Sequence, residues 1–537
     1  RTDIQKLCEQ ATGALDTASL IVVEFGDFAR LDHYWLHLGP QRQRDLVAQT
    51  MEELDRLLER LTSRVAAGTV LVLVTPSPPA NLPGGGESLV PCLFLSNPSH
   101  PRLMVSSSTR RLGLVTNIDL GPALLSYLNG DAASIADSPQ ISGYSHQDPL
   151  GYLDQFYKRS SLVYQQRPPL LKGYVLALIG SLLISLGGML LGIPAVARLN
   201  WMFKFIMLVP LASLILSRWP EFPAGSVYLS GALLAGSTAL LLLVLSLVKI
   251  KGDNFFWAAL GLITAIALLL DTMGGSNLQQ FSLLGYDPIA GARYYGLGNE
   301  YMGVLIGATL LGTITLVGGV PGKKLAHRTA AGKGGKLAAV TVFLSYLWVI
   351  YLLSSPALGA NFGGTLSAAV AFGAAWAGLG FSCGKKVSLL WTMGYFISVA
   401  LLLLWALNFG QQSGLPSHVG QLGEAVARGG QTVIWETVVR KLTMNWRLIR
   451  YSIWSRALVV LLGSMIVLFF YPVGVLKLLY RQRPEMLQVS VAGGAGALAA
   501  LLTNDSGVVA AALVLLYTVP PLWISVVNQT LTKTIKV

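Results

Sequence analysis

The sequence predicts a polytopic, all-α membrane domain preceded by an extracytoplasmic α/β domain. Of its 537 residues, 53% are hydrophobic and only 12% are charged, whereas soluble proteins carry about 25% charged residues. Residues 1–171 hold 14 Lys+Arg and 17 Asp+Glu, while residues 172–537 hold 25 and 9. The excess cations stand in short loops between apolar runs, which is typical of a membrane protein and argues against nucleic-acid binding.

Residues 1–135 alternate strand-like and helix-like segments. Residues 19–25 and 69–74 are apolar runs that predict buried strands, and residues 42–66 predict a charged amphipathic helix. Such alternation is typical of a parallel sheet. Asp27, Asp32 and His33 follow the first run, where they either bind a ligand or act as solvated or capping residues. Residues 136–171 are the predicted linker.

Eleven apolar stretches, each about 17 to 25 residues and so able to cross roughly 30 Å of hydrocarbon, follow in residues 172–537. They are 173–193, 201–217, 226–248, 255–271, 300–319, 337–354, 363–381, 387–408, 457–476, 488–503 and 507–527.

Lys and Arg residues orient these spans. If the first span enters from outside, the cytoplasmic loops and the C-terminal tail hold 15 Lys and Arg, and the short outer loops hold only Arg218 and Arg293. The positive-inside rule therefore places the N-terminal domain outside the cytoplasmic membrane and the C-terminus inside. A domain exported ahead of an odd number of spans needs a carrier, so we expect an upstream signal or a twelfth helix.

Polar residues gather at three helix starts on the predicted outer side. The fifth span begins at Asn299 and Glu300, the seventh follows Asn361, and the eleventh follows Asp505. Capping accounts for Asn and Asp at helix starts, but a carboxylate such as Glu300 at the edge of hydrocarbon is typical of a functional site. We therefore predict a shared polar site, with these four residues as catalytic candidates and Arg293 as a substrate-binding one.

The long outer loop 409–456 contains an amphipathic segment. Six apolar residues recur at three- and four-residue steps and so share one helix face: Trp435, Val439, Leu442, Trp446, Ile449 and Ile453. The helix either lies in the membrane interface or covers the bundle as a lid. Arg440 and Arg447 flank that face, and a guanidinium fork suits a phosphate headgroup. Both are predicted to bind substrate.

Four segments resemble the metal-binding second half of the alkaline phosphatase superfamily: residues 32–40, 55–58, 70–75 and 108–122. That family holds two metal ions, but its ligand positions are occupied here by Leu36 and by Thr75-Pro76-Ser77-Pro78. The resemblance therefore implies a degenerate domain without metal or cofactor, suited to docking a partner protein.

Residues 293–300 read Arg-Tyr-Tyr-Gly-Leu-Gly-Asn-Glu. This segment resembles the Arg-x-x-Gly-x-x-Asn-x-Asn helix start of O-antigen ligases and polymerases, with Tyr301 in place of the second Asn. Those polytopic glycosyltransferases also carry a long outer loop with basic amphipathic helices. Their Ser-Arg-Gly helix start is here Gly359-Ala360-Asn361. The resemblance implies a polyprenyl-phosphate-linked substrate.

Three functions compete. The first is a transferase acting outside on a lipid-linked glycan or phospholipid-type precursor of a bacterial-type envelope, in which Glu300 deprotonates the acceptor and Arg440 and Arg447 balance charge on the leaving phosphate. The second is a transporter or flippase, against which the scarcity of charges at span centres counts. The third is a non-catalytic scaffold with a pseudo-enzyme outer domain. All three have membrane lipids as partners.

Overall fold

The chain folds into two compact units. The first contains Arg1–Tyr164 and Asp287–Tyr294, and the second contains Gln165–Tyr286 and Tyr295–Val537. The computed structural model describes residues 2–63, 69–81, 89–96, 101–132, 135–247, 253–291, 293–318, 333–381, 385–412, 431–470 and 475–534. The stretch predicted as a linker, 136–171, contains a strand and the beginning of a long helix.

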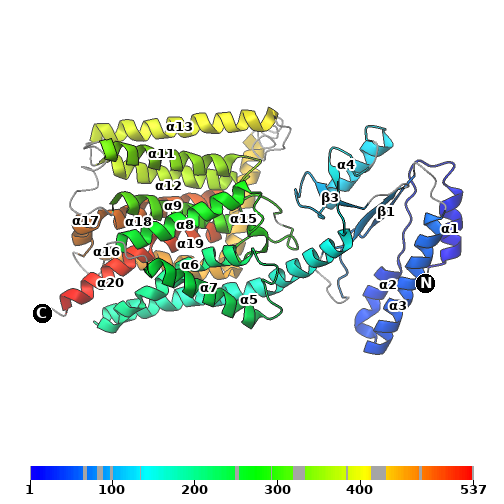
Figure 1. Ribbon diagram of the computed structural model, residues 1–537, viewed down its shortest axis with the longest axis horizontal. Coiled ribbons are helices and arrows are strands. Elements are labelled where there is room, and N and C mark those ends of the chain that lie inside the picture. The colour runs from blue at the N-terminus through cyan, green and yellow to red at the C-terminus, as the bar shows by residue number, and fades with distance from the viewer. Residues whose placement is uncertain are drawn as a thin grey trace. The chain divides into compact units, whose positions relative to one another are not determined.

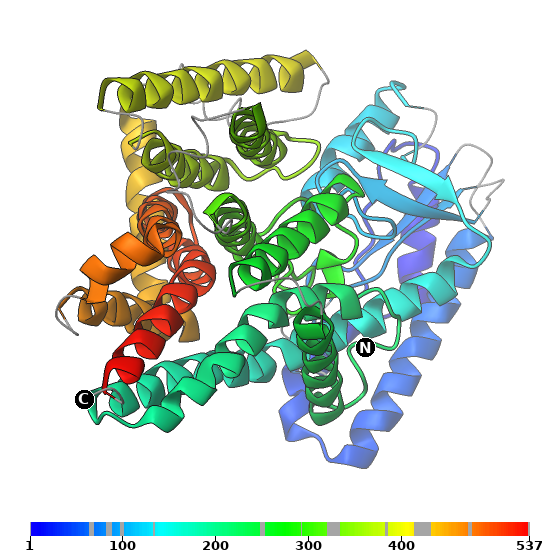
Figure 2. The same ribbon diagram turned by 60° about the vertical axis from the view of Figure 1, so that its left-hand side comes forward.

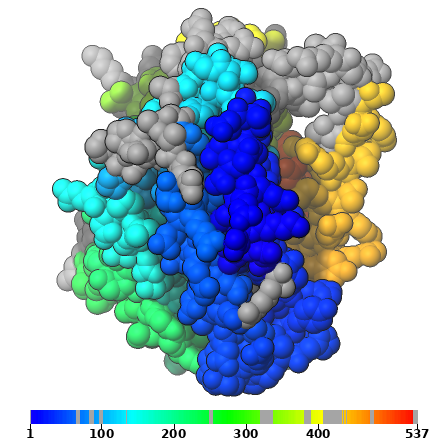
Figure 3. Space-filling view, turned by 90° about the vertical axis from the view of Figure 1, so that its right-hand side faces the viewer, coloured from blue at the N-terminus to red at the C-terminus, as the bar shows by residue number. Residues whose placement is uncertain are grey.

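The first unit combines helices with short strands. Its elements are α1 (Ile4–Gly13), α2 (Asp27–Tyr34), the 3-10 helix η1 (Trp35–His37), α3 (Pro40–Thr62), β1 (Val70–Val74), β2 (Cys92–Ser96), β3 (Arg102–Ser106), α4 (Asn117–Leu128), β4 (Ile141–Ser145) and the first part of α5 (Pro149–Leu190). The predicted helix at 42–66 forms as α3 and the predicted strand at 69–74 forms as β1. α1 and α2 both pack against α3, and these helices lie at the surface of the unit (Figure 3).

The parallel sheet predicted for residues 1–135 is not found among the described residues. β1 pairs with β2 and β3 pairs with β4, both antiparallel, and the run 19–25 is not a strand. α4 lies between β3 and β4 in the chain, yet β4 runs opposite to β3. The alternation of helices and strands along the chain does not by itself fix the direction in which two strands pair.

The second unit is a helical bundle. After the remainder of α5 it contains η2 (Pro194–Leu199), α6 (Asn200–Leu216), α7 (Val227–Leu247), α8 (Asp253–Met273), η3 (Gln279–Phe281), α9 (Asn299–Gly318), α11 (Lys333–Ser354), α12 (Phe362–Phe381), α13 (Lys385–Gln412), α15 (Gln431–Tyr451), α16 (Ile453–Phe470), α17 (Val475–Gln482), α18 (Pro484–Thr503), α19 (Gly507–Thr518) and α20 (Pro520–Thr534). Figure 1 shows α8, α9, α11, α12 and α13 running side by side, and α13 lies at the margin of the bundle in Figure 2 as well.

The helices make this a polytopic membrane protein. Among the described residues, eight helices are long and apolar enough to cross a membrane, or ten if each of two bent pairs counts as one span. The predicted total of eleven is not reached among the described residues. The predicted span 387–408 lies on α13, whose apolar part Leu389–Trp405 is shorter. The predicted span 507–527 bends by 41° between α19 and α20, because Pro520 and Pro521 lack the N–H groups that would continue the helix.

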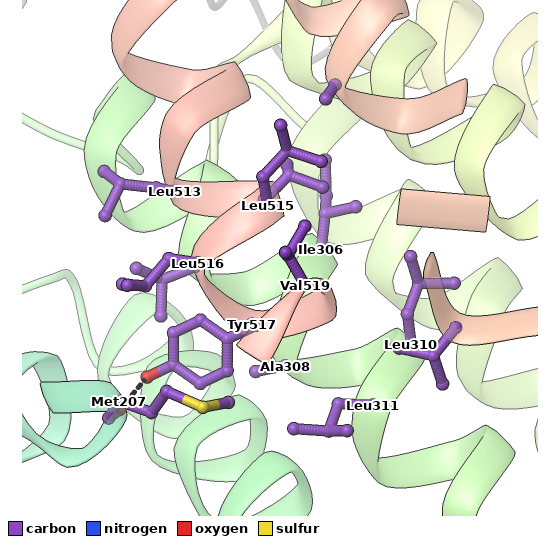
Figure 4. Close-up of a cluster of buried hydrophobic side chains, with 14 of the residues drawn as sticks. Met207, Ile306, Ala308, Leu310, Leu311, Leu513, Leu515, Leu516, Tyr517 and Val519 are labelled. Carbon is purple, nitrogen blue, oxygen red and sulfur yellow. Dashed lines mark hydrogen bonds between the residues drawn. The ribbon is translucent and has the colours of Figure 1, made fainter. Parts of the chain in front are cut away.

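The core of the second unit lies around α9 and α19. All of α19 is buried, as is α9 from Tyr301 to Thr315. Figure 4 shows Leu513 and Leu516 of α19 in this core, and the Tyr517 hydroxyl donates a hydrogen bond to the Met207 carbonyl of α6 at 2.7 Å. Because lipid is as apolar as the side chains, such close packing and buried hydrogen bonds are what hold membrane helices together.

Candidate functional site

The starts of α9 and α12 are joined by hydrogen bonds. The Asn361 side chain donates from Nδ2 to Asn299 Oδ1 at 3.1 Å and to the Leu297 carbonyl at 3.0 Å. Its Oδ1 accepts from the Gly364 N–H at 2.8 Å, so Asn361 also caps α12. The two loops approach closely, since a Cβ on Gly296 (φ +76°) would lie 2.5 Å from the Gly359 carbonyl oxygen. Asn361 therefore both caps α12 and links it to the start of α9.

The start of α12 is joined in turn to the turn between α18 and α19. Thr503 Oγ1 donates to the Gly363 carbonyl at 3.0 Å, and Asn504 Nδ2 donates to Ser367 Oγ at 3.1 Å. Asp505 directly follows Asn504. The three helix starts predicted to form one site thus meet at one end of the bundle, which we call the site end.

α15 crosses this end. The Lys441 ammonium donates to the Thr503 carbonyl at 2.6 Å, and Asn445 Nδ2 donates to the Asn504 carbonyl at 2.9 Å. Asn445 Oδ1 accepts from the Val508 N–H at 3.3 Å. Asn445 is buried and satisfies backbone groups on both sides of the turn. It therefore fixes α15 to the same turn that carries Asp505.

Glu300 faces a cation. The Arg167 guanidinium on α5 lies 4.0 Å from Glu300 Oε1, and both side chains are largely buried. Arg167 also donates from Nε to the Leu283 carbonyl at 2.8 Å and from Nη2 to the Gly285 carbonyl. Two backbone carbonyls thus orient the guanidinium, and its charge offsets the cost of holding Glu300 away from water.

One carboxylate oxygen of Asp505 has no hydrogen-bond donor among the described residues. This atom, Oδ1, is buried. A buried polar atom without a partner costs roughly 1–3 kcal/mol, and such an atom is a natural contact point for a ligand that brings a donor. Asp505 is therefore the residue of the site with an open hydrogen-bonding position.

The two predicted arginines of α15 lie elsewhere on the helix. Arg440 and Arg447 are exposed, whereas Lys441 and Asn445 contact the turn. The predicted apolar face is also exposed, with Trp435 at 69% and Trp446 at 59%. α15 turns by 87° from α16. An exposed apolar face on a helix turned across the bundle favours the interfacial position over the packed lid.

The remaining candidates lie in the first unit. Arg293 belongs to the segment Asp287–Tyr294, which folds with that unit. Asp27 accepts from the Thr2 N–H and from Arg30, and these hydrogen bonds outweigh burial and lower its pKa. Asp32 accepts from the N–H groups of Ala80 and Asn81. Protein donors thus occupy both carboxylates, and no group of three metal-ligating side chains occurs among the described residues.

A cavity of about 1330 Å³ also lies within the first unit. β1, β2 and α4 contribute apolar walls, including Val70, Phe94 and Leu120, and Thr116 and Asn117 add polar groups. None of the seven predicted site residues lines it. The chemistry-bearing residues and this cavity are therefore separate features.

Arg167, Lys441 and Asn445 were not among the site residues predicted from the sequence. Arg167 had one usable signal, since it is an arginine six residues before the first apolar span, followed by Pro168-Pro169. Lys441 and Asn445 are four residues apart and so share a helix face, but neither is among the six apolar residues that marked the amphipathic segment.

Comparison of the chain with protein-family models, curated proteins and solved structures found no match.

Proposed function

We propose that this protein is an extracytoplasmic transferase that acts on a lipid-linked precursor of the cell envelope. The observation that supports the proposal is that hydrogen bonds join the starts of α9 and α12 to the turn between α18 and α19. Glu300 lies in the first turn of α9, and Asp505 lies in the turn before α19. Helix caps alone do not require three starts to share one network, nor a carboxylate faced by an arginine.

The site offers the groups that such a transfer needs. Glu300 takes the proton of an acceptor hydroxyl while that oxygen attacks the carbon bonded to the lipid phosphate. The carbon–oxygen bond to the phosphate breaks, and its electron pair leaves on the phosphate oxygen. Cations of α15 balance the resulting negative charge. The free Oδ1 of Asp505 accepts a hydrogen bond that positions the acceptor.

Ion-coupled transport is less well supported. Among the described residues of the second unit, the buried carboxylates are Asp271 and Glu485, near the end of α8 and at the start of α18. Asp271 accepts from the N–H groups of Leu278 and Gln279, which is a structural role. An ion pathway needs ionisable groups across the middle of the spans.

Replacing Glu300 by Gln tests the proposal. We expect Glu300→Gln to lower the release of prenyl diphosphate from prenyl-diphosphate-linked sugars by about 100-fold or more, because an amide cannot take a proton. Mass spectrometry of the lipid products in purified full-length protein measures this release. Glu221→Gln, the same change at an exposed position between α6 and α7, should have no effect.

Full activity in Glu300→Gln would show that the carboxylate is not a general base and would contradict the proposed transferase function. If neither the wild-type protein nor the control released a lipid product from any prenyl-phosphate or phospholipid donor, that result would favour a non-catalytic scaffold.

A further inference from the structure

An apolar groove lies at the site end between α15 and α18. Its volume is about 470 Å³, and its lining includes Leu442, Trp446 and Ile449 of α15 and Leu501 and Leu502 of α18. Leu442 and Leu502 are 53% and 61% exposed. The groove is therefore open to whatever surrounds the bundle.

The groove continues into an apolar stripe. Leu502, Leu498 and Val491 of α18 stand at four- and seven-residue steps and share one helix face, and all three are at least 60% exposed. α18 is long and apolar enough to cross a membrane. A hydrocarbon chain seated in the groove would thus find a continuous apolar path along this helix.

α15, which forms one side of the groove, carries an excess of cations. It has Arg440, Lys441, Arg447 and Arg450 against a single carboxylate, Glu436. The Arg450 guanidinium lies 5.2 Å from the ring centre of Trp446, which itself lines the groove. Apolar walls beside guanidinium and ammonium groups match an amphiphile with an anionic phosphate head.

The groove also touches the site. Asn445 lines it and donates to the Asn504 carbonyl, and Lys441 donates to the carbonyl of Thr503, two residues before Asp505. A chain in the groove therefore places its head beside the residues that carry the chemistry.

We propose that this groove binds the hydrocarbon chain of the phosphate-headed lipid substrate, with the cations of α15 holding its phosphate. The identity of this lipid as the substrate rests on the proposed transferase function. The groove therefore recognises the lipid substrate by its hydrocarbon chain as well as by its phosphate headgroup.

Photolabelling of the full-length protein in detergent tests the groove without requiring catalysis. The probe is hexadecyl phosphate with a diazirine in its chain, compared with the same chain on a neutral glucoside. Mass spectrometry maps the labelled peptides. We expect labelling on α15 and the end of α18 to be at least fivefold stronger with the phosphate probe.

Two variants sharpen the test. Leu502→Trp fills the groove and should lower this labelling at least fivefold, whereas Leu240→Trp, at an equally exposed position on α7, should not change it. Arg450→Gln should reduce the preference for the phosphate probe, because this guanidinium contacts the groove-lining Trp446. If Leu502→Trp fails to fold, Trp446→Ala removes a wall of the groove instead and should lower labelling at least threefold.

Equal labelling by both probes would identify the occupant as bulk membrane lipid and overturn the proposal, as would unchanged labelling in the groove variants. Glu300→Gln should label like the wild-type protein. If Glu300→Gln lost activity but the probe did not label the groove, only the proposal that the groove binds the lipid chain would be refuted. Groove labelling in a fully active Glu300→Gln would refute the transferase mechanism.

Discussion

Asn361 shows how one side chain caps one helix and holds the start of another. Its oxygen caps α12, while its amide nitrogen reaches across to Asn299 and Leu297. Sequence reasoning left capping and function as alternatives, because both favour Asn before a helix. The structure shows that Asn361 does more than cap its own helix, since a helix cap uses only the oxygen.

Exchange of Asn361 for Asp separates these two roles. Asp caps a helix as well as Asn, but a carboxylate would face the oxygens of Leu297 and Asn299. We expect Asn361→Asp to destabilise the protein by about 1–3 kcal/mol and to reduce activity. Thermal unfolding in detergent measures the first effect. Asp3→Asn at the start of α1, where the side chain accepts from the Lys6 N–H, is the matched control and should be near neutral. A neutral Asn361→Asp would mean that capping is its only role.

Asp27 gives the first unit a pH dependence. Its pKa lies below the ordinary 3.8 because hydrogen bonds from Thr2 and Arg30 outweigh the effect of burial. A lowered folded-state pKa adds stability that is complete above the unfolded pKa and is lost as the pH falls through the folded value. We expect Asp27→Asn to weaken hydrogen-exchange protection of α2 at pH 7, and this difference to shrink towards pH 2. Asp16→Asn, at an exposed position, should show neither effect. A difference that stays constant with pH would exclude a charge effect.

At the scale of elements, close packing of α9 against α19 holds the site in place. A Cβ on Gly307 would lie 2.8 Å from Tyr517 Cβ and 2.9 Å from the Val514 carbonyl oxygen. Backbone atoms cannot move aside as a flexible side chain can, so only glycine permits this approach. The α9 start carries Asn299 and Glu300, so the distance between these helices sets the geometry of the site.

Gly307→Val should therefore push α9 and α19 apart. We expect a loss of about 1–3 kcal/mol or more from overpacking, and reduced activity without any change in the site residues. Unfolding in detergent reports the loss. Gly463→Ala on α16, where a Cβ meets nothing within 4 Å, should behave like the wild-type protein. Equal stability of the two variants would contradict the tight packing of α9.

At the scale of the whole molecule, the distribution of Lys and Arg predicts which ends of the helices face the cytoplasm. We expect a cysteine at Asn277, an exposed residue after α8, to react with a membrane-impermeant maleimide in sealed cells. A cysteine at Ala195, exposed between α5 and α6, should react only after the cells are opened. A protein lacking Cys8, Cys92 and Cys383 is the background for both. The reverse pattern would place the site end in the cytoplasm and contradict the proposed extracytoplasmic chemistry.

The sequence by itself determined the membrane class and most helix positions, because a stretch that must cross hydrocarbon is marked by its own composition. It also selected Asn299, Asn361 and Asp505, since polar groups at the edges of apolar runs stand out locally. Only the tertiary structure decided that β3 and β4 pair antiparallel, that Arg167 faces Glu300, and that Lys441 and Asn445, not Arg440 and Arg447, contact the site. Each of these contacts joins groups that are far apart in the sequence. The side of a helix that faces the site depends on the elements that pack against the helix.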